Sequence, residues 1–95
     1  MSDLITAAVA TLNEKLGGDF DGSAKFVITD EGAIMLDGAG ARAGDEDSDV
    51  TLTADADTFR EIIEGELNPT NAFMSGRLTI DGDMGTAMKL ASALS

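Results

Sequence analysis

The stretch that decides the fold reads Asn68-Pro69-Thr70-Asn71-Ala72-Phe73-Met74-Ser75-Gly76-Arg77-Leu78-Thr79-Ile80-Asp81-Gly82-Asp83-Met84-Gly85. Asn68 can accept hydrogen bonds from the free amides of a first helical turn, and Pro69 already has the φ angle that the first helical position requires. These residues predict a short helix from Pro69 to about Met74. Gly76 is placed to end that helix.

The second half of the stretch predicts a strand and another helix. Leu78 and Ile80 alternate with polar neighbours, which is typical of a half-buried strand. Residues 81–83 read as a turn, with Asp83 as the N-cap of a last helix that runs to about Leu94. Large flexible apolar side chains therefore flank one strand on both sides.

In the sequence before Asn68, apolar periodicity and turn residues predict the remaining elements. The residues 38–43 carry small side chains, which fit either an edge strand or a space left for a ligand, and we favour the edge strand. The other predicted elements are a helix capped by Ser2 or Asp3, running to about Leu16 and ended by Gly17-Gly18, strands over 24–29, 33–37 and 50–54, and a helix over 57–64 capped by Asp55 or Asp57. The pattern predicts an α+β fold with an antiparallel-rich sheet of about five strands and helices on one face.

The quoted stretch resembles the signature of the sterol carrier protein type 2 family, Asn-Pro-x-x-Ala-Phe-Met-x-Gly-x-Leu-x-Ile-x-Gly-Asp-Met-Gly. The match runs from Asn68 to Gly85, and the order of the upstream elements agrees with that family over almost the whole chain. The resemblance implies an apolar pocket between the sheet and the helices. It also implies non-catalytic binding, and transfer, of a fatty acid, a fatty acyl-CoA or a sterol-like lipid.

Length and charge narrow the classes of partner. The 95 residues suit one domain, residues 1–95, and the chain carries 18 acidic and 6 basic residues for a formal charge of −12. This charge repels phosphate backbones and anionic headgroups, so we expect no nucleic-acid partner. The sequence shows no signal peptide and no run of transmembrane length, which predicts a cytoplasmic protein with no stable membrane insertion.

Residue usage argues against an enzyme and against a metal site. The sequence has no histidine, cysteine or tyrosine, so no serine has an imidazole to activate it. The carboxylates Asp45, Asp47 and Asp49 alternate like calcium ligands, but Val50 and Ala56 occupy the positions that need glycine and glutamate. We therefore expect no catalytic residue, no metal and no cofactor.

The methionines and phenylalanines are the candidates for ligand contact, because long unbranched methionine side chains adapt to variable apolar ligands. We read Met35, Met74, Met84 and Met88 as an adaptable wall together with three phenylalanines. The predicted lipid-binding residues, taken as converging on one sheet face, are Phe26, Ile28, Phe59, Ile63, Phe73, Met74, Leu78, Met84 and Met88. The alternative is an interaction or dimerisation domain whose core is filled by these side chains.

The last predicted helix provides a surface through which two copies of the chain could associate. Since the chain ends at Ser95, we expect this helix to leave one flank of the pocket apolar and exposed. A second copy could cover that flank, which predicts a weak homodimer. The charge of −12 opposes it at low ionic strength.

Overall fold

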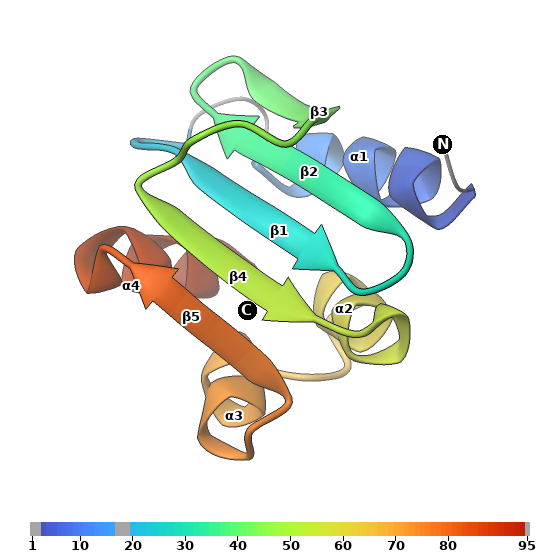
Figure 1. Cartoon of the computed structure of the whole chain (residues 1–95), viewed down its shortest axis with the longest axis vertical. Coiled ribbons are helices and arrows are strands. Elements are labelled where there is room, and N and C mark those ends of the chain that lie inside the picture. The colour runs from blue at the N-terminus through green and yellow to red at the C-terminus, as the bar shows by residue number, and fades with distance from the viewer. Residues whose placement is uncertain (1–2, 17–19, 95) are drawn as a thin grey trace.

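A five-stranded sheet and four helices make up the described part of the chain. The computed structural model describes residues 3–16 and 20–94, and its helices cover one face of the sheet (Figure 1). The elements are α1 (Asp3–Leu16), β1 (Ala24–Ile28), β2 (Gly32–Asp37), β3 (Gly40–Ala43), β4 (Val50–Ala54), α2 (Ala56–Ile63), α3 (Pro69–Met74), β5 (Leu78–Gly82) and α4 (Met84–Leu94).

The sheet order is β3-β2-β1-β4-β5, with β1 in the centre. The strands β1, β2 and β3 form an antiparallel meander, β4 pairs in parallel with β1, and β5 pairs antiparallel with β4. The register places Ile34, Phe26, Leu52 and Ile80 in one row across four strands. The predicted antiparallel-rich α+β fold is confirmed.

Strict alternation along β1 and β4 determines which face of the sheet is buried. Ala24, Phe26 and Ile28 are buried while the residues between them are half-buried, and β4 repeats the pattern. Because successive strand residues point to opposite faces, the buried set faces the helices. The rings of Phe26 and Phe59 meet with centroids 5.2 Å apart and tilted by 57°, which joins the central strand to α2.

Side-chain caps define where the helices begin. The carboxylate of Asp55 accepts a hydrogen bond from the Thr58 backbone N–H at 2.7 Å, and Asn68 Oδ1 accepts one from the Thr70 N–H at 2.8 Å. These bonds satisfy amides of the first turn that have no partner within the helix. The cap of α2 is therefore Asp55, the first of the two predicted candidates.

The boundaries of β1, β2 and α2 differ from the sequence predictions by one residue, β3 begins two residues later than the predicted segment, and the largest change in assignment is at β5. Residues 81 and 82, predicted as part of a turn, belong to β5, where Gly82 pairs with Val50. The strand extends because an antiparallel partner of equal length is available, which a single sequence does not show. The residues 40–43 form the favoured edge strand, whereas the predicted cap Ser2 and helix end Gly17-Gly18 lie outside the described residues.

Gly82 provides a test of the β4–β5 pairing. Its φ is +119°, and a Cβ there would lie 2.5 Å from the Asp49 carbonyl oxygen and 2.9 Å from the Val50 Cα. We expect Gly82→Ala to lower the free energy of unfolding by backbone strain, roughly 1–2 kcal/mol, and by this clash as well.

Gly65→Ala is the matched control, because Gly65 has φ +79° while a Cβ there meets no described atom within 4 Å. Urea unfolding followed by circular dichroism should show the larger loss for Gly82→Ala. Equal losses in the two variants would mean that the close approach of β4 and β5 adds nothing to stability.

Candidate ligand-binding groove

An apolar groove with a volume of about 240 Å³ lies where α3 and α4 both pack against β5. Its lining comes from four elements: the consecutive α3, β5 and α4, and the more distant β4. The lining residues are Leu52, Pro69, Thr70, Phe73, Met74, Leu78, Ile80, Met84, Ala87, Met88 and Ala91. Thr70 supplies the one polar side chain in this lining.

The groove has a buried floor and an exposed rim. Leu78 and Ala87 are each 2% exposed and form part of the floor. The rim consists of four side chains whose exposed fractions are unusual for large apolar groups. They are Phe73 (42%), Met74 (77%), Met84 (47%) and Met88 (55%), referred to below as the apolar rim.

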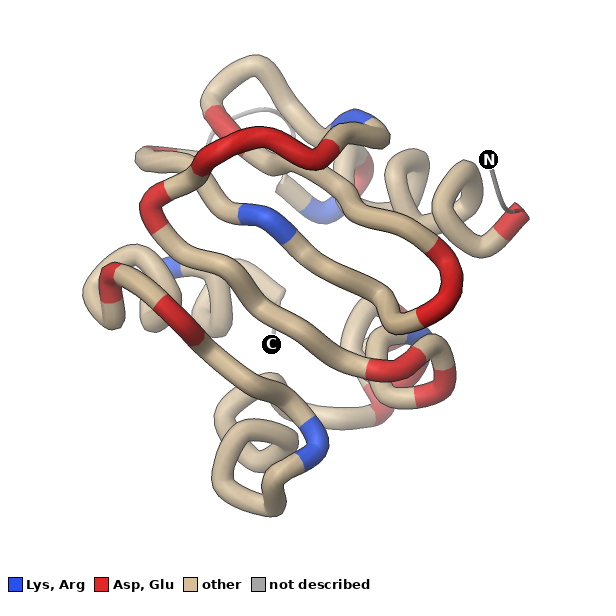
Figure 2. Tube along the Cα trace, in the orientation of Figure 1, with Lys and Arg blue, Asp and Glu red and all other residues tan. Residues whose placement is uncertain are grey.

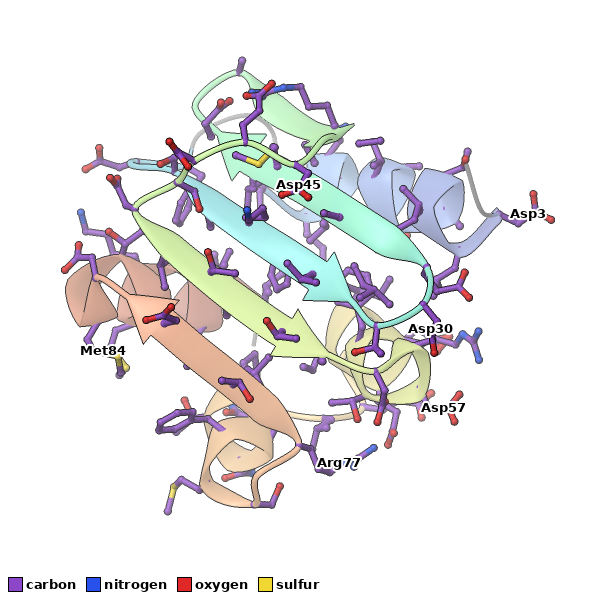
Figure 3. The ribbon with its side chains drawn as sticks, in the orientation of Figure 1. Asp3, Asp30, Asp45, Asp57, Arg77 and Met84 are labelled. Atoms are coloured by element: carbon purple, nitrogen blue, oxygen red, sulfur yellow. The ribbon has the colours of Figure 1, made fainter. Side chains whose placement is uncertain are left out.

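The capping of α4 positions the rim methionines. Asp83 Oδ2 accepts hydrogen bonds from the Thr86 hydroxyl at 2.6 Å and the Thr86 N–H at 3.3 Å, and Oδ1 accepts one from the Gly85 N–H at 3.3 Å. The hydroxyl bond from Thr86 and then its backbone bond hold the pKa of Asp83 below its ordinary value. The carboxylate therefore stays ionised and anchors the turn from which Met84 projects (Figure 3).

Five of the nine predicted lipid-binding residues come together in this groove: Phe73, Met74, Leu78, Met84 and Met88. The other four, Phe26, Ile28, Phe59 and Ile63, belong to the packed core, where each is at most 5% exposed. They share the inner side of the sheet with the groove floor but do not line it. The role of all nine in ligand contact stays a prediction.

Met35 does not belong to the wall of methionines that the sequence suggested. It follows Ile34, which faces the helices, so strand alternation turns Met35 to the opposite face of the sheet. There it is 2% exposed, and its sulfur accepts a hydrogen bond from the Glu46 N–H at 3.4 Å. Its burial comes from the segment after β3, not from the helices.

Sequence reasoning missed six lining residues. Ile80 shares its strand face with Leu78, and Ala87 and Ala91 lie three positions after Met84 and Met88, so sequence periodicity could have found these three. Leu52 carried no such signal, since it reaches the groove only through its register with Ile80. The two remaining residues, Pro69 and Thr70, were assigned to the start of α3 alone.

The residues of the acidic segment before β4 make local contacts. Asp45 pairs with Lys25 across the outer sheet face, with 2.8 Å between carboxylate oxygen and Nζ. Asp49 accepts a hydrogen bond from the Ser23 N–H at 3.2 Å, and the Ser23 hydroxyl accepts one from the Asp49 N–H at 2.9 Å. These interactions fasten the segment to β1.

The groove can bind an apolar group but supplies no acid or base, because none of its lining side chains titrates. None of the helices in the described part of the chain has the length and hydrophobicity needed to span a bilayer. Desolvation of apolar surface is the interaction that this arrangement offers to a ligand.

Comparison with known sequences finds a family match over most of the chain and matches to curated relatives. Residues 6–95 match the SCP-2 sterol transfer family. The chain is 33% identical over 102 residues to hydroxysteroid dehydrogenase-like protein 2 of Xenopus tropicalis, covering 99% of this chain and 24% of that protein. It is also 44% identical over 46 residues to human sterol carrier protein 2, covering 48% of this chain and 8% of that protein. The chain thus spans at most about a quarter of these curated relatives.

Solved structures share the fold. The sterol carrier protein domain 2 of Helicoverpa armigera is 28% identical and superimposes with a TM-score of 0.77, covering 96% of this chain and 85% of that domain. Sterol carrier protein 2 of Aedes aegypti, in complex with the C16 fatty acid palmitate, is 20% identical with a TM-score of 0.79, covering 100% and 97%. At that lower identity the likeness concerns the fold alone. On the match over residues 6–95, the chain belongs to the SCP-2 sterol transfer family.

Proposed function

We propose that this chain is a non-catalytic carrier that binds the apolar chain of a lipid in the groove between α3, α4 and β5. The observation that carries the proposal is a groove lined by apolar side chains and bordered by four exposed ones, on a protein whose surface is otherwise strongly charged. Exposed apolar patches on small proteins mark interaction sites or ligand grooves. Membership of the SCP-2 sterol transfer family supports a lipid as the ligand.

The size of the groove bounds what it holds. A group the size of a water molecule takes about 30 Å³, so a volume of 240 Å³ accommodates on the order of eight methylene-sized groups. Burying each methylene contributes about 0.8 kcal/mol, before the costs of association and ordering are deducted. The groove in this form therefore suits a short chain, or the end segment of a longer one.

The rim lets the groove adapt to longer ligands. Three of its four residues are methionines, whose unbranched side chains change rotamer at little cost. Rearrangement of these exposed side chains would lengthen the groove without disturbing the core. This is consistent with a carrier that accepts chains of several lengths.

The similarity to dehydrogenase-like proteins gives no reason to propose dehydrogenase activity for this chain. The match covers 24% of hydroxysteroid dehydrogenase-like protein 2, whose name describes the whole protein. The groove of this chain has no titratable lining group to move a proton. A binding and transfer role needs none.

Met88→Glu tests the proposed function. A carboxylate at this rim position has no basic partner in the lining, so it should oppose the entry of methylenes and lower the affinity for an apolar ligand at least about tenfold. The measurement is titration with N-phenyl-1-naphthylamine, an uncharged dye that fluoresces in apolar surroundings, followed by displacement with 1-decanol.

Ala93→Glu provides the matched control, because it adds the same charge to an exposed position of α4 that lies outside the groove. It should leave dye binding unchanged, and thermal unfolding should show that both variants fold. Unchanged affinity in Met88→Glu, or equal loss in both variants, would contradict the proposed function.

A dimerisation domain is the rival function, and the same rim supports it, since Met74 is 77% exposed. If the rim packs against a second copy, association should increase with salt, because salt screens the repulsion between two chains of charge −12. Sedimentation equilibrium at low and moderate salt measures this, with Met74→Asp as the variant that should abolish it. A monomer under both conditions at high micromolar concentration would rule the dimer out.

A further inference from the structure

We infer that the groove selects lipids with an uncharged head group over lipids that carry a carboxylate, phosphate or sulfate. The inference rests on the proposed function and specifies its substrate class. It follows from the positions of the charged side chains around α3, α4 and β5, all of which the structure describes.

None of the six basic side chains of the sequence lines the groove. Two of them lie next to groove residues in the sequence, and both point elsewhere. Arg77, just before β5, extends toward α2, where Nη2 is 2.6 Å from Glu61 Oε2 and Nε donates to the Thr58 hydroxyl at 3.2 Å (Figure 3). Lys89 projects into a separate cleft shared with Lys15, and its Nζ is 3.3 Å from Asp21.

Three further basic groups form ion pairs with residues that do not line the groove. Lys25 pairs with Asp45, and Arg60 is 3.8 Å from Asp57 on α2. Arg42 on β3 pairs with Asp37 at 2.9 Å and with Glu46 at 3.2 Å. Five of the six basic side chains are thus held in ion pairs, and the sixth, Lys15 on α1, lines the separate cleft and not the groove.

Apart from Arg77 and Lys89, the side chains next to groove residues in the sequence are uncharged or acidic. Residues 67–76 contain no charged side chain, and the tube along α3 is tan throughout in Figure 2, with neither blue nor red. On the α4 side, the ionised carboxylate of Asp83 directly precedes the lining residue Met84. A second anion there would be repelled at short range, and the charge of −12 adds a repulsion at longer range.

A neutral polar head group meets no such obstacle. The Thr70 side chain is exposed and lines the groove, and its hydroxyl can both donate and accept a hydrogen bond. An alcohol, an ester or a monoacylglycerol could bond to it or to water while its chain lies on Leu78 and Ile80. A carboxylate could accept one bond from Thr70 but would lose part of its hydration without a compensating charge.

The test compares 1-decanol with decanoate at pH 8, where the acid is ionised, as competitors of N-phenyl-1-naphthylamine. Decanoate should bind at least about tenfold more weakly than decanol. Moderate salt should be used in all titrations, so that long-range repulsion is screened and the local effect is measured. Equal binding, or tighter binding of decanoate, would overturn the inference while leaving the proposed function intact.

A cation placed at the groove should change this preference. Thr70→Lys should narrow the gap between decanoate and decanol several-fold, and Thr70→Gln, with a long neutral side chain, should keep the ratio seen in the parent protein. An unchanged ratio in Thr70→Lys would count against the charge explanation. If neither ligand displaces the dye from the parent protein, the proposed function fails, and this inference fails with it.

Discussion

The antiparallel pairing of β5 with β4 is the constraint on which the groove depends. It fixes β5 at the edge of the sheet, with Leu78 opposite Ala54 and Gly82 opposite Val50. In the chain, helix α3 precedes β5 and helix α4 follows it, and both helices pack against this strand. The pairing of β5 with β4 therefore places both helices at this edge of the sheet. Without it, the floor and the two walls of the groove would have no common support.

Apolar side chains in this protein fall into two groups with different tasks. The residues around Phe26 and Phe59 are buried in a core that joins α1, α2, α4 and the sheet, and their burial supplies the main stabilisation of the fold. Those around Met84 and Met88 are about half exposed and contribute less to folding. A small domain loses stability when its core holds a large cavity, so a groove at the edge of the sheet separates binding from folding.

Charge is segregated in the same way. The acidic residues concentrate between β3 and β4 and along α2, where many of them pair with the few basic side chains (Figure 2). The α3 surface carries none. Because a charged group next to an apolar ligand must lose part of its hydration, a region without charge is the one that accepts a lipid chain at least cost. The high net charge elsewhere opposes the association of two copies through the exposed rim.

Much of this protein was determined by local sequence. The elements and the fold class follow from signals between residues only a few positions apart. These signals are caps such as Asn68 and Asp83, the alternation in β1 and β4, and the helix period. The signature from Asn68 to Gly85 indicated the family, and five of the predicted contact residues lie together in the groove.

The tertiary structure decided which apolar residues are core and which are groove. Phe26 and Phe73 are equally apolar in sequence, yet one is 2% exposed and the other 42%. Strand register brought Leu52 to the groove floor, and strand alternation placed Met35 on the opposite face. Periodicity identifies an apolar face but not what covers it, since covering depends on elements that are distant in the sequence.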